Sequence, residues 1–186
     1  MSSIEEVDLK ALIKKCVEED RAAQKQLYMR YYSYGMGICL RYVKDEAEGI
    51  SCLNDSFLKV FDNIEKFDPN RDFKPWLKTI LINTLLNHLR KINKLSSNVD
   101  LNKASGIGYK EEIISNIQYA DLLKIVQQLS SNYRTVFNMY VLDGYNHEEI
   151  ADRLNINVST SRSNLTRAKA RLRQLLGHIT TMEYEK

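Results

Sequence analysis

Apolar residues recur every three or four positions along most of this chain, a spacing typical of amphipathic α-helices. The period predicts helices at residues 5–19, 21–42 and 45–64, and a fourth helix whose first turn holds Pro75. No sustained alternation of apolar and polar residues, the pattern of a half-buried β-strand, is present. The pattern therefore predicts an all-α fold.

One long stretch interrupts the helical period. Residues 95–117 are rich in Ser, Asn and Gly, which predicts a flexible linker. Helical spacing returns at residues 119–129 and 133–142. Because 186 residues suffice for two small domains, we expect helical domains at residues 1–94 and 118–186, joined by this linker.

Residues 146–176 show the sharpest local pattern, that of two helices joined by a tight turn. Asn146 is placed to cap the first helix, and Asn155 tolerates the left-handed conformation that the turn requires. Ser159 is placed to cap the second helix. The arrangement predicts a helix-turn-helix, which in DNA-binding proteins places its second helix in the major groove.

The second helix of this pair is apolar on one face and basic on the other. Leu165, Ala168, Leu172 and the pair Leu175 and Leu176 are expected on the apolar face, and polar or cationic side chains occupy the opposite one. Residues 159–177 hold five Lys or Arg residues and no acidic residue. Such a helix is suited to lie against a polyanion. The alternative is an ordinary amphipathic helix with a solvated basic face.

A second basic region lies in the first half of the chain. Residues 71–94 hold six Lys or Arg residues and one acid, Asp72. The net charge of the whole chain is only +3, so the distribution of charge is more informative than its sum. Two separated basic regions favour two contacts on one long polyanion.

Other classes of function lack support in the sequence. The three cysteines, Cys16, Cys39 and Cys52, form no C-x-x-C pair and are expected to be buried free thiols rather than a zinc or redox site. No nucleophile–base, phosphate-binding or metalloprotease motif is present. We therefore expect no enzyme activity, metal or cofactor. The acidic N-terminus and the lack of a long apolar run predict a cytoplasmic protein.

Four motifs, taken in order, resemble those of a known family. L-N-D-S-F-L-K-V-F at residues 53–61 is followed by N-T-L-L-N-H-L-R-K at 83–91. The second half holds L-S-S-N-Y-R-T-V-F at 129–137 and T-S-R-S-N-L-T-R-A at 160–168. In this order and spacing the motifs resemble bacterial RNA polymerase sigma factors of the extracytoplasmic-function (ECF) branch.

The resemblance implies two helical domains, sigma regions 2 and 4, that bind core RNA polymerase and promoter DNA. In the family, the recognition helix of region 4 reads the −35 element as a duplex. Arginine can bond guanine bidentately, and Ser or Thr can contact base edges or phosphate. The residues here that match or extend this surface are Ser159, Thr160, Arg162, Ser163, Thr166, Arg167 and Arg171.

Region 2 of the family opens the duplex and reads the −10 element as a single strand. That task needs cations along the backbone and polar or ring surfaces for unstacked bases. The loop before the fourth helix and one face of that helix supply this mixture. The expected −10 residues are Asn70, Arg71, Phe73, Lys74, Thr84, Asn87, His88 and Lys91.

The third helix of the family docks on the large subunit of the polymerase. The matching residues here are Ser51, Asn54, Asp55 and Lys59. Many members of the family are held inactive by an anti-sigma factor, which the resemblance implies as a further partner. The alternative function is a stand-alone helix-turn-helix regulator that binds an operator without polymerase. The second basic region favours the sigma factor.

Overall fold

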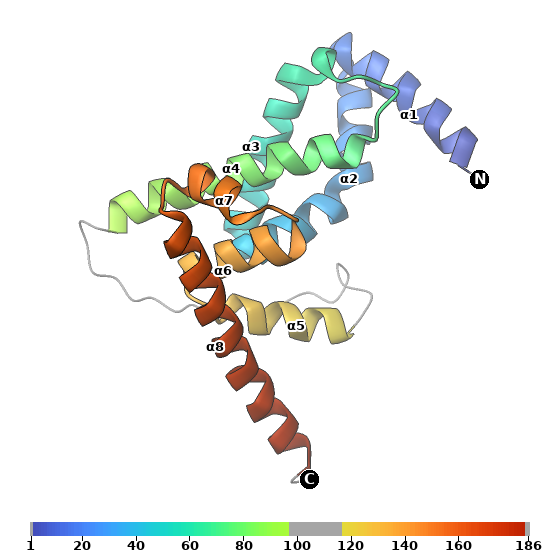
Figure 1. The fold of residues 1–186 in the computed structure, drawn as a ribbon. Helices are drawn as coiled ribbons and strands as arrows, with labels where there is room; N and C mark the ends of the chain where they lie inside the picture. Colours follow the sequence, from blue (N-terminus) through green and yellow to red (C-terminus); the bar gives the residue numbers. More distant parts are fainter. Residues whose placement is uncertain (1, 97–116, 185–186) are drawn as a thin grey trace. The chain divides into compact units, whose positions relative to one another are not determined.

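A computed structural model describes the backbone of residues 2–96 and 117–184, and the side chains of residues 9–92 and 120–177. Every regular element in these ranges is a helix (Figure 1), which confirms the all-α prediction. The predicted linker at residues 95–117 lies almost entirely outside the described residues. The chain divides into two compact units.

The N-terminal unit comprises Met1–Cys39 and Asp45–Ser105. Its elements are α1 (Ser2–Val17), α2 (Arg21–Tyr42, of which the last residues belong to the other unit), α3 (Glu46–Asn63), the 3₁₀-helix η1 (Ile64–Lys66) and α4 (Phe73–Ser96). The four predicted helices are confirmed, with starts or ends shifted by a few residues.

Local sequence signals explain where these helices begin. Asp45 caps α3, because its carboxylate accepts hydrogen bonds from the backbone N–H groups of Ala47 (2.7 Å) and Glu48 (3.3 Å). Asp20 plays the same part before α2 and accepts from the N–H of Ala23 at 2.9 Å.

The core of the N-terminal unit lies where α2, α3 and α4 meet. Leu27, Leu53 and Leu81 are fully shielded from solvent. Figure 1 shows α3 and α4 packed side by side. A Cβ atom at Gly35 would overlap the side chain of Leu53, so glycine at this position lets α2 and α3 approach closely.

The C-terminal unit comprises Leu40–Lys44 and Gly106–Lys186. Its elements are α5 (Ile117–Gln127), α6 (Ser131–Phe137), the π-helical turn η3 (Asn138–Leu142), α7 (His147–Leu154) and α8 (Val158–Tyr184). The predicted helix at residues 133–142 is therefore two segments, because the backbone widens into a π-helix from Asn138.

The core of the C-terminal unit is built on α8. Ala168 and Leu172 pack with Ile125 and Leu129, and Leu165 is also buried. In Figure 1, α6 and α7 lie against the first half of α8. The predicted apolar face of this helix is confirmed through Leu172 and Leu175, which packs against the cluster, whereas Leu176 is exposed.

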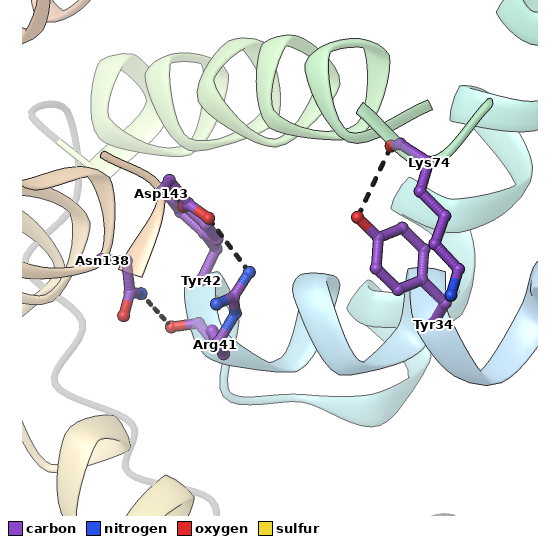
Figure 2. A network of polar contacts seen from close by, with 6 residues as sticks. All are labelled: Tyr34, Arg41, Tyr42, Lys74, Asn138 and Asp143. Atoms are coloured by element: carbon purple, nitrogen blue, oxygen red, sulfur yellow. Dashed lines mark hydrogen bonds and ion pairs between the residues drawn. The ribbon is translucent and has the colours of Figure 1, made fainter. Parts of the chain in front are cut away.

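Polar side chains of the C-terminal unit also hold Leu40–Lys44, where helix α2 ends. The last carbonyls of a helix have no partner within it. Here the side chain of Arg134 donates to the carbonyl of Tyr42 (3.0 Å), that of Asn138 to Arg41 (2.5 Å), and that of Gln127 to Leu40 (2.8 Å). Figure 2 shows Asn138 at Arg41 and also Asp143, whose carboxylate accepts from Arg41 (3.2 Å) and from the hydroxyl of Tyr42 (2.5 Å).

Candidate nucleic-acid interface

The helix-turn-helix forms with the predicted turn chemistry. Asn146 and Glu149 make a capping box: the N–H of Glu149 donates to Asn146 Oδ1, and the N–H of Asn146 donates to Glu149 Oε2, both at 2.8 Å. Asn155 ends α7 in the left-handed conformation, at φ 53° and ψ 51°. Both predictions are confirmed.

The prediction that Ser159 caps the second helix is wrong. Helix α8 begins at Val158, so Ser159 already lies in its first turn. The N–H of Ser161 donates to the carbonyl of Asn157 at 3.0 Å, which continues the helical bonding back to that residue. Ser159 keeps an exposed side chain.

The outward face of α8 is polar and open to solvent. Arg162, Ser163, Thr166 and Arg167 are exposed, as are Ser159 and Arg171, whereas Thr160 is half-buried. The hydroxyl of Thr166 donates to the carbonyl of Arg162 (3.1 Å), and that of Ser163 donates to Thr160 (3.0 Å). These hydroxyl oxygens therefore face outward mainly as acceptors.

Two arginines of this face have side-chain partners within the unit. Arg162 lies 3.6 Å from the carboxylate of Glu148 on α7, and both side chains are mostly exposed (64% and 67%). Arg171 donates to Gln174 at 3.3 Å. Exposed pairs of this kind are worth less than about 1 kcal/mol, so phosphate can displace Glu148 from Arg162.

A buried polar contact between α7 and α8 was not predicted from the sequence. Ser161 is fully buried, and its Oγ lies 2.9 Å from Nδ1 of His147, the first residue of α7. The His147 ring stacks on Tyr140 with ring centroids 4.5 Å apart. Helical spacing places Ser161 one turn before Leu165 on the inward face of α8, but only the packing of α7 on α8 shows that its partner is His147.

In the N-terminal unit, the loop before α4 is a tight turn. The N–H of Arg71 donates to the carbonyl of Asp68 at 3.0 Å, and the Asp68 carboxylate accepts from the N–H of Asn70 at 3.0 Å. Asn70, Arg71 and Lys74 are exposed. Lys74 also lies over the ring of Tyr34, 5.6 Å from its centroid, and its carbonyl accepts from the Tyr34 hydroxyl at 3.5 Å (Figure 2).

Phe73 does not lie in the exposed loop, contrary to the prediction. It is the first residue of α4 and is only 2% exposed. Its ring packs against Tyr31 (4.8 Å between centroids), Phe67 (5.3 Å) and Trp76 (5.5 Å). The aromatic cluster draws Phe73 inward, since burial of a phenyl ring is worth about 1.5–3 kcal/mol.

The predicted reading face of α4 is only partly exposed. Asn87 and Lys91 are exposed. Thr84 is 4% exposed, and its hydroxyl accepts from Lys59 of α3 at 2.9 Å and donates to the carbonyl of Ile80 at 2.9 Å. The Nε2 atom of His88 is shielded, with no hydrogen-bond partner among the described residues. The packing of α3 on α4 therefore covers Thr84.

The four expected polymerase-binding residues share the open side of α3. Ser51, Asn54, Asp55 and Lys59 are all exposed. The amide oxygen of Asn54 accepts from the hydroxyl of Tyr28 at 2.8 Å, and Lys59 reaches Thr84 as described. Two of the four side chains are thus oriented by neighbours within the unit.

A cavity of about 480 Å³ lies beside the turn before α4. Leu9, Lys10 and Ile13 of α1 form one wall, and Phe67 with the residues from Pro69 to Pro75 forms another. Sequence reasoning did not find it, because α1 and the turn are separated by more than fifty residues of chain.

Within the described residues, no group of His, Cys, Asp and Glu side chains could hold a metal ion. None of the described helices combines the length and apolar content of a membrane span. Cys16, Cys39 and Cys52 are buried thiols that form no disulfide, as expected. Burial raises the pKa of the Cys16 and Cys52 thiols to about 11.

Comparison with known proteins identifies the family. Residues 27–95 match the model of sigma-70 region 2, and residues 119–172 match that of sigma-70 region 4. The two matches coincide with the helices that carry the candidate surfaces. The chain belongs to the sigma-70 family of RNA polymerase sigma factors.

Individual relatives place the chain within the family. It is 25% identical to the ECF RNA polymerase sigma-E factor of Haemophilus influenzae, over 89% of this chain and 93% of that protein. It is 27% identical to the ECF RNA polymerase sigma factor SigW of Bacillus subtilis, over 92% and 98%. The chain is an ECF-type sigma factor, a non-catalytic protein that directs promoter recognition by RNA polymerase.

A solved structure shares the fold. The sigma factor RpoE of Bartonella quintana, in complex with the anti-sigma factor NepR, aligns with a TM-score of 0.54 and 21% identity. The alignment covers 82% of this chain and 96% of that one.

Proposed function

We propose that the outward face of α8 reads the −35 element as duplex DNA. The observation that carries the proposal is the row of exposed side chains at Arg162, Ser163, Thr166 and Arg167 on one regular helix of a helix-turn-helix. A major groove admits such a helix, and arginine distinguishes guanine there through a bidentate contact. Ser159, Thr160 and Arg171 lie at the margins of this face and are assigned to phosphate.

The turn before α4 and the exposed edge of that helix are assigned to the −10 element. Asn70, Arg71 and Lys74 offer one amide and two cations beside the cavity, and Asn87 and Lys91 continue the surface along α4. Unpaired bases require polar edges and ring surfaces, and the strand between them requires cations. The buried Phe73 and Thr84 and the shielded His88 support this surface from beneath.

The open side of α3 is assigned to core polymerase. Ser51, Asn54, Asp55 and Lys59 are exposed there. On this assignment the working domains are residues 1–94 and 118–186, and the protein acts in the cytoplasm, where polymerase and promoter are found. We also infer control by an anti-sigma factor, because the Bartonella sigma factor of the same fold was captured with one.

A promoter library transcribed by the reconstituted holoenzyme tests the α8 assignment. Arg167→Ala is expected to reduce discrimination at one −35 position by about 1–3 kcal/mol, as for a lost bidentate base contact. Arg173→Ala is the matched control, an exposed arginine of the same helix outside the proposed reading set.

The outcomes separate the possible roles. Loss of preference at one position with Arg167→Ala, but not with Arg173→Ala, supports the proposal. An equal loss on every promoter would show that Arg167 meets only phosphate.

A further inference from the structure

The side-chain amide of Asn70 is hydrogen-bonded at one end to a cation and at the other end to an anion. Its oxygen Oδ1 accepts from the ammonium of Lys10 on α1 at 3.1 Å. Its nitrogen Nδ2 donates to the carboxylate of Asp68 at 3.1 Å. Each partner suits only one end of the amide, because an ammonium has only donors and a carboxylate has only acceptors.

These two partners fix which way the amide points. Rotating the group by half a turn would place its NH₂ against the Lys10 ammonium and its oxygen against the Asp68 carboxylate. The partly positive NH₂ would then face the Lys10 ammonium, and the partly negative oxygen would face the Asp68 carboxylate, so both contacts would be repulsive. The turn itself holds Asp68 in place, since the same carboxylate also accepts from the backbone N–H of Asn70 at 3.0 Å.

The held amide still has bonding capacity for a ligand. An amide offers two N–H donors and two acceptor lone pairs, and one of each is used by Asp68 and Lys10. One donor and one acceptor therefore remain, in a fixed order, beside the cavity that Asn70 and Lys10 both line.

We propose that Lys10 is a positioning residue that sets the order of donor and acceptor that Asn70 presents to a base of the −10 element. The proposal rests on the assignment of Asn70 to that element. On the Watson–Crick edge, adenine and cytosine carry an amino donor next to a ring nitrogen that accepts, whereas guanine and thymine carry a keto acceptor next to a ring N–H that donates. A fixed amide therefore separates amino bases from keto bases, whereas an amide free to flip accepts both.

Lys10 brings α1 into promoter reading. The match to the model of sigma-70 region 2 begins at residue 27, so α1 lies outside that matched segment. The bond between Lys10 and Asn70 joins exposed side chains. Exposed bonds of this kind add little stability, so the variant Lys10→Met is expected to fold normally.

The test measures base preference at each −10 position, with full-length variants, core polymerase and a library carrying all four bases there. Asn70→Ala identifies the position that Asn70 reads. At that position, Lys10→Met is expected to lower the preference between amino and keto bases by at least about threefold, part of what a bidentate contact supplies. Lys10→Arg, which keeps a cationic donor, is expected to retain the preference. Lys15→Met removes an equal charge from an exposed position of the same helix and is expected to leave the preference unchanged.

Each failure has its own signature. If Asn70→Ala changes no base preference, Asn70 is not a reader, and both its assignment and the role of Lys10 are overturned. If Asn70→Ala shifts the preference but Lys10→Met does not, only the role of Lys10 is overturned. A loss with Lys10→Met that is equal for all four bases would show that Lys10 acts through phosphate or stability.

Discussion

The two candidate reading surfaces are built differently. In the C-terminal unit the surface is one face of a single helix, α8, whose proposed reading side chains project into solvent. In the N-terminal unit it combines a turn, the edge of α4 and a cavity walled partly by α1. There, residues expected to be exposed, Phe73 and Thr84, are part of the interior.

The difference follows from the form of DNA that each surface is assigned to read. A duplex presents base edges in a regular groove, so a rigid helix with an outward row of side chains suffices. Unpaired bases have lost their stacking partners, and a protein must supply ring faces and enclosing walls instead. A surface with walls must bury some of the side chains that form it.

The largest expected effect tests whether Phe73 is a structural residue. Phe73→Ala removes a ring packed against Tyr31, Phe67 and Trp76 and is expected to destabilise the N-terminal unit by about 3–5 kcal/mol. The chain has one tryptophan, Trp76, so its fluorescence during urea unfolding reports this unit. Phe73→Leu, which retains most of the volume, is expected to cost less.

A base-reading role for Phe73 makes the opposite prediction. If the Phe73 ring stacked on a base, substituting it would lower the promoter preference of the holoenzyme at little cost in the stability of the unit. A stability loss below about 1 kcal/mol for Phe73→Ala would contradict the burial argument and return Phe73 to the reading surface.

The sequence predicts the α8 surface better than the surface of the N-terminal unit, because the first is one face of a single helix and the second joins several elements. The face of α8 follows from helical period alone, since Leu165 and Ala168 mark the inside and Arg162 and Thr166 the outside. In the turn before α4, period gives no such guide. Whether Phe73 turns outward or inward depends on Tyr31 and Phe67, which come from other elements.

Contacts between distant residues were also beyond sequence reasoning. Thr84 shares a face of α4 with His88 by spacing, but its exposure is decided by Lys59 on α3. The bond from Lys10 to Asn70 joins residues sixty positions apart. Neither motif nor period reports such pairs, whereas the caps at Asn146 and Asn155 depend on neighbours within a few residues and were predictable.

A smaller effect is expected for the buried arginine of the C-terminal unit. Arg134 donates to the carbonyls of Tyr42 and Gln127, each at 3.0 Å, and of Leu129 at 3.4 Å. Arg134→Met leaves buried acceptors without these donors and is expected to destabilise the unit by about 3 kcal/mol. Far-UV circular dichroism during urea unfolding measures the loss.

Two controls assign this effect to the C-terminal unit. Arg171→Met removes an exposed arginine of the same unit and is expected to change stability by less than about 0.5 kcal/mol. The Trp76 transition, which reports the other unit, is expected to stay in place. Equal losses of stability for Arg134→Met and Arg171→Met would mean that the hydrogen bonds of Arg134 stabilise the unit no more than an exposed charge does.

The smallest expected effect separates support from reading within α8 itself. Ser161 is fully buried and shares a hydrogen bond with His147, whereas Ser163, two residues on, is exposed on the outward face. Ser161→Ala is expected to cost about 1 kcal/mol in stability, the usual net value of such a bond, and to leave −35 preference unchanged, because no outward side chain is altered. Ser163→Ala is expected to do the reverse, with stability preserved within about 0.5 kcal/mol and preference altered at one position. Unfolding in urea and the −35 promoter library measure both variants.

If Ser161→Ala altered base preference as strongly as Ser163→Ala, the outward face would depend on how α7 holds α8. The reading surface of this unit would then resemble that of the N-terminal unit, in which the residues behind the surface help to decide what it reads.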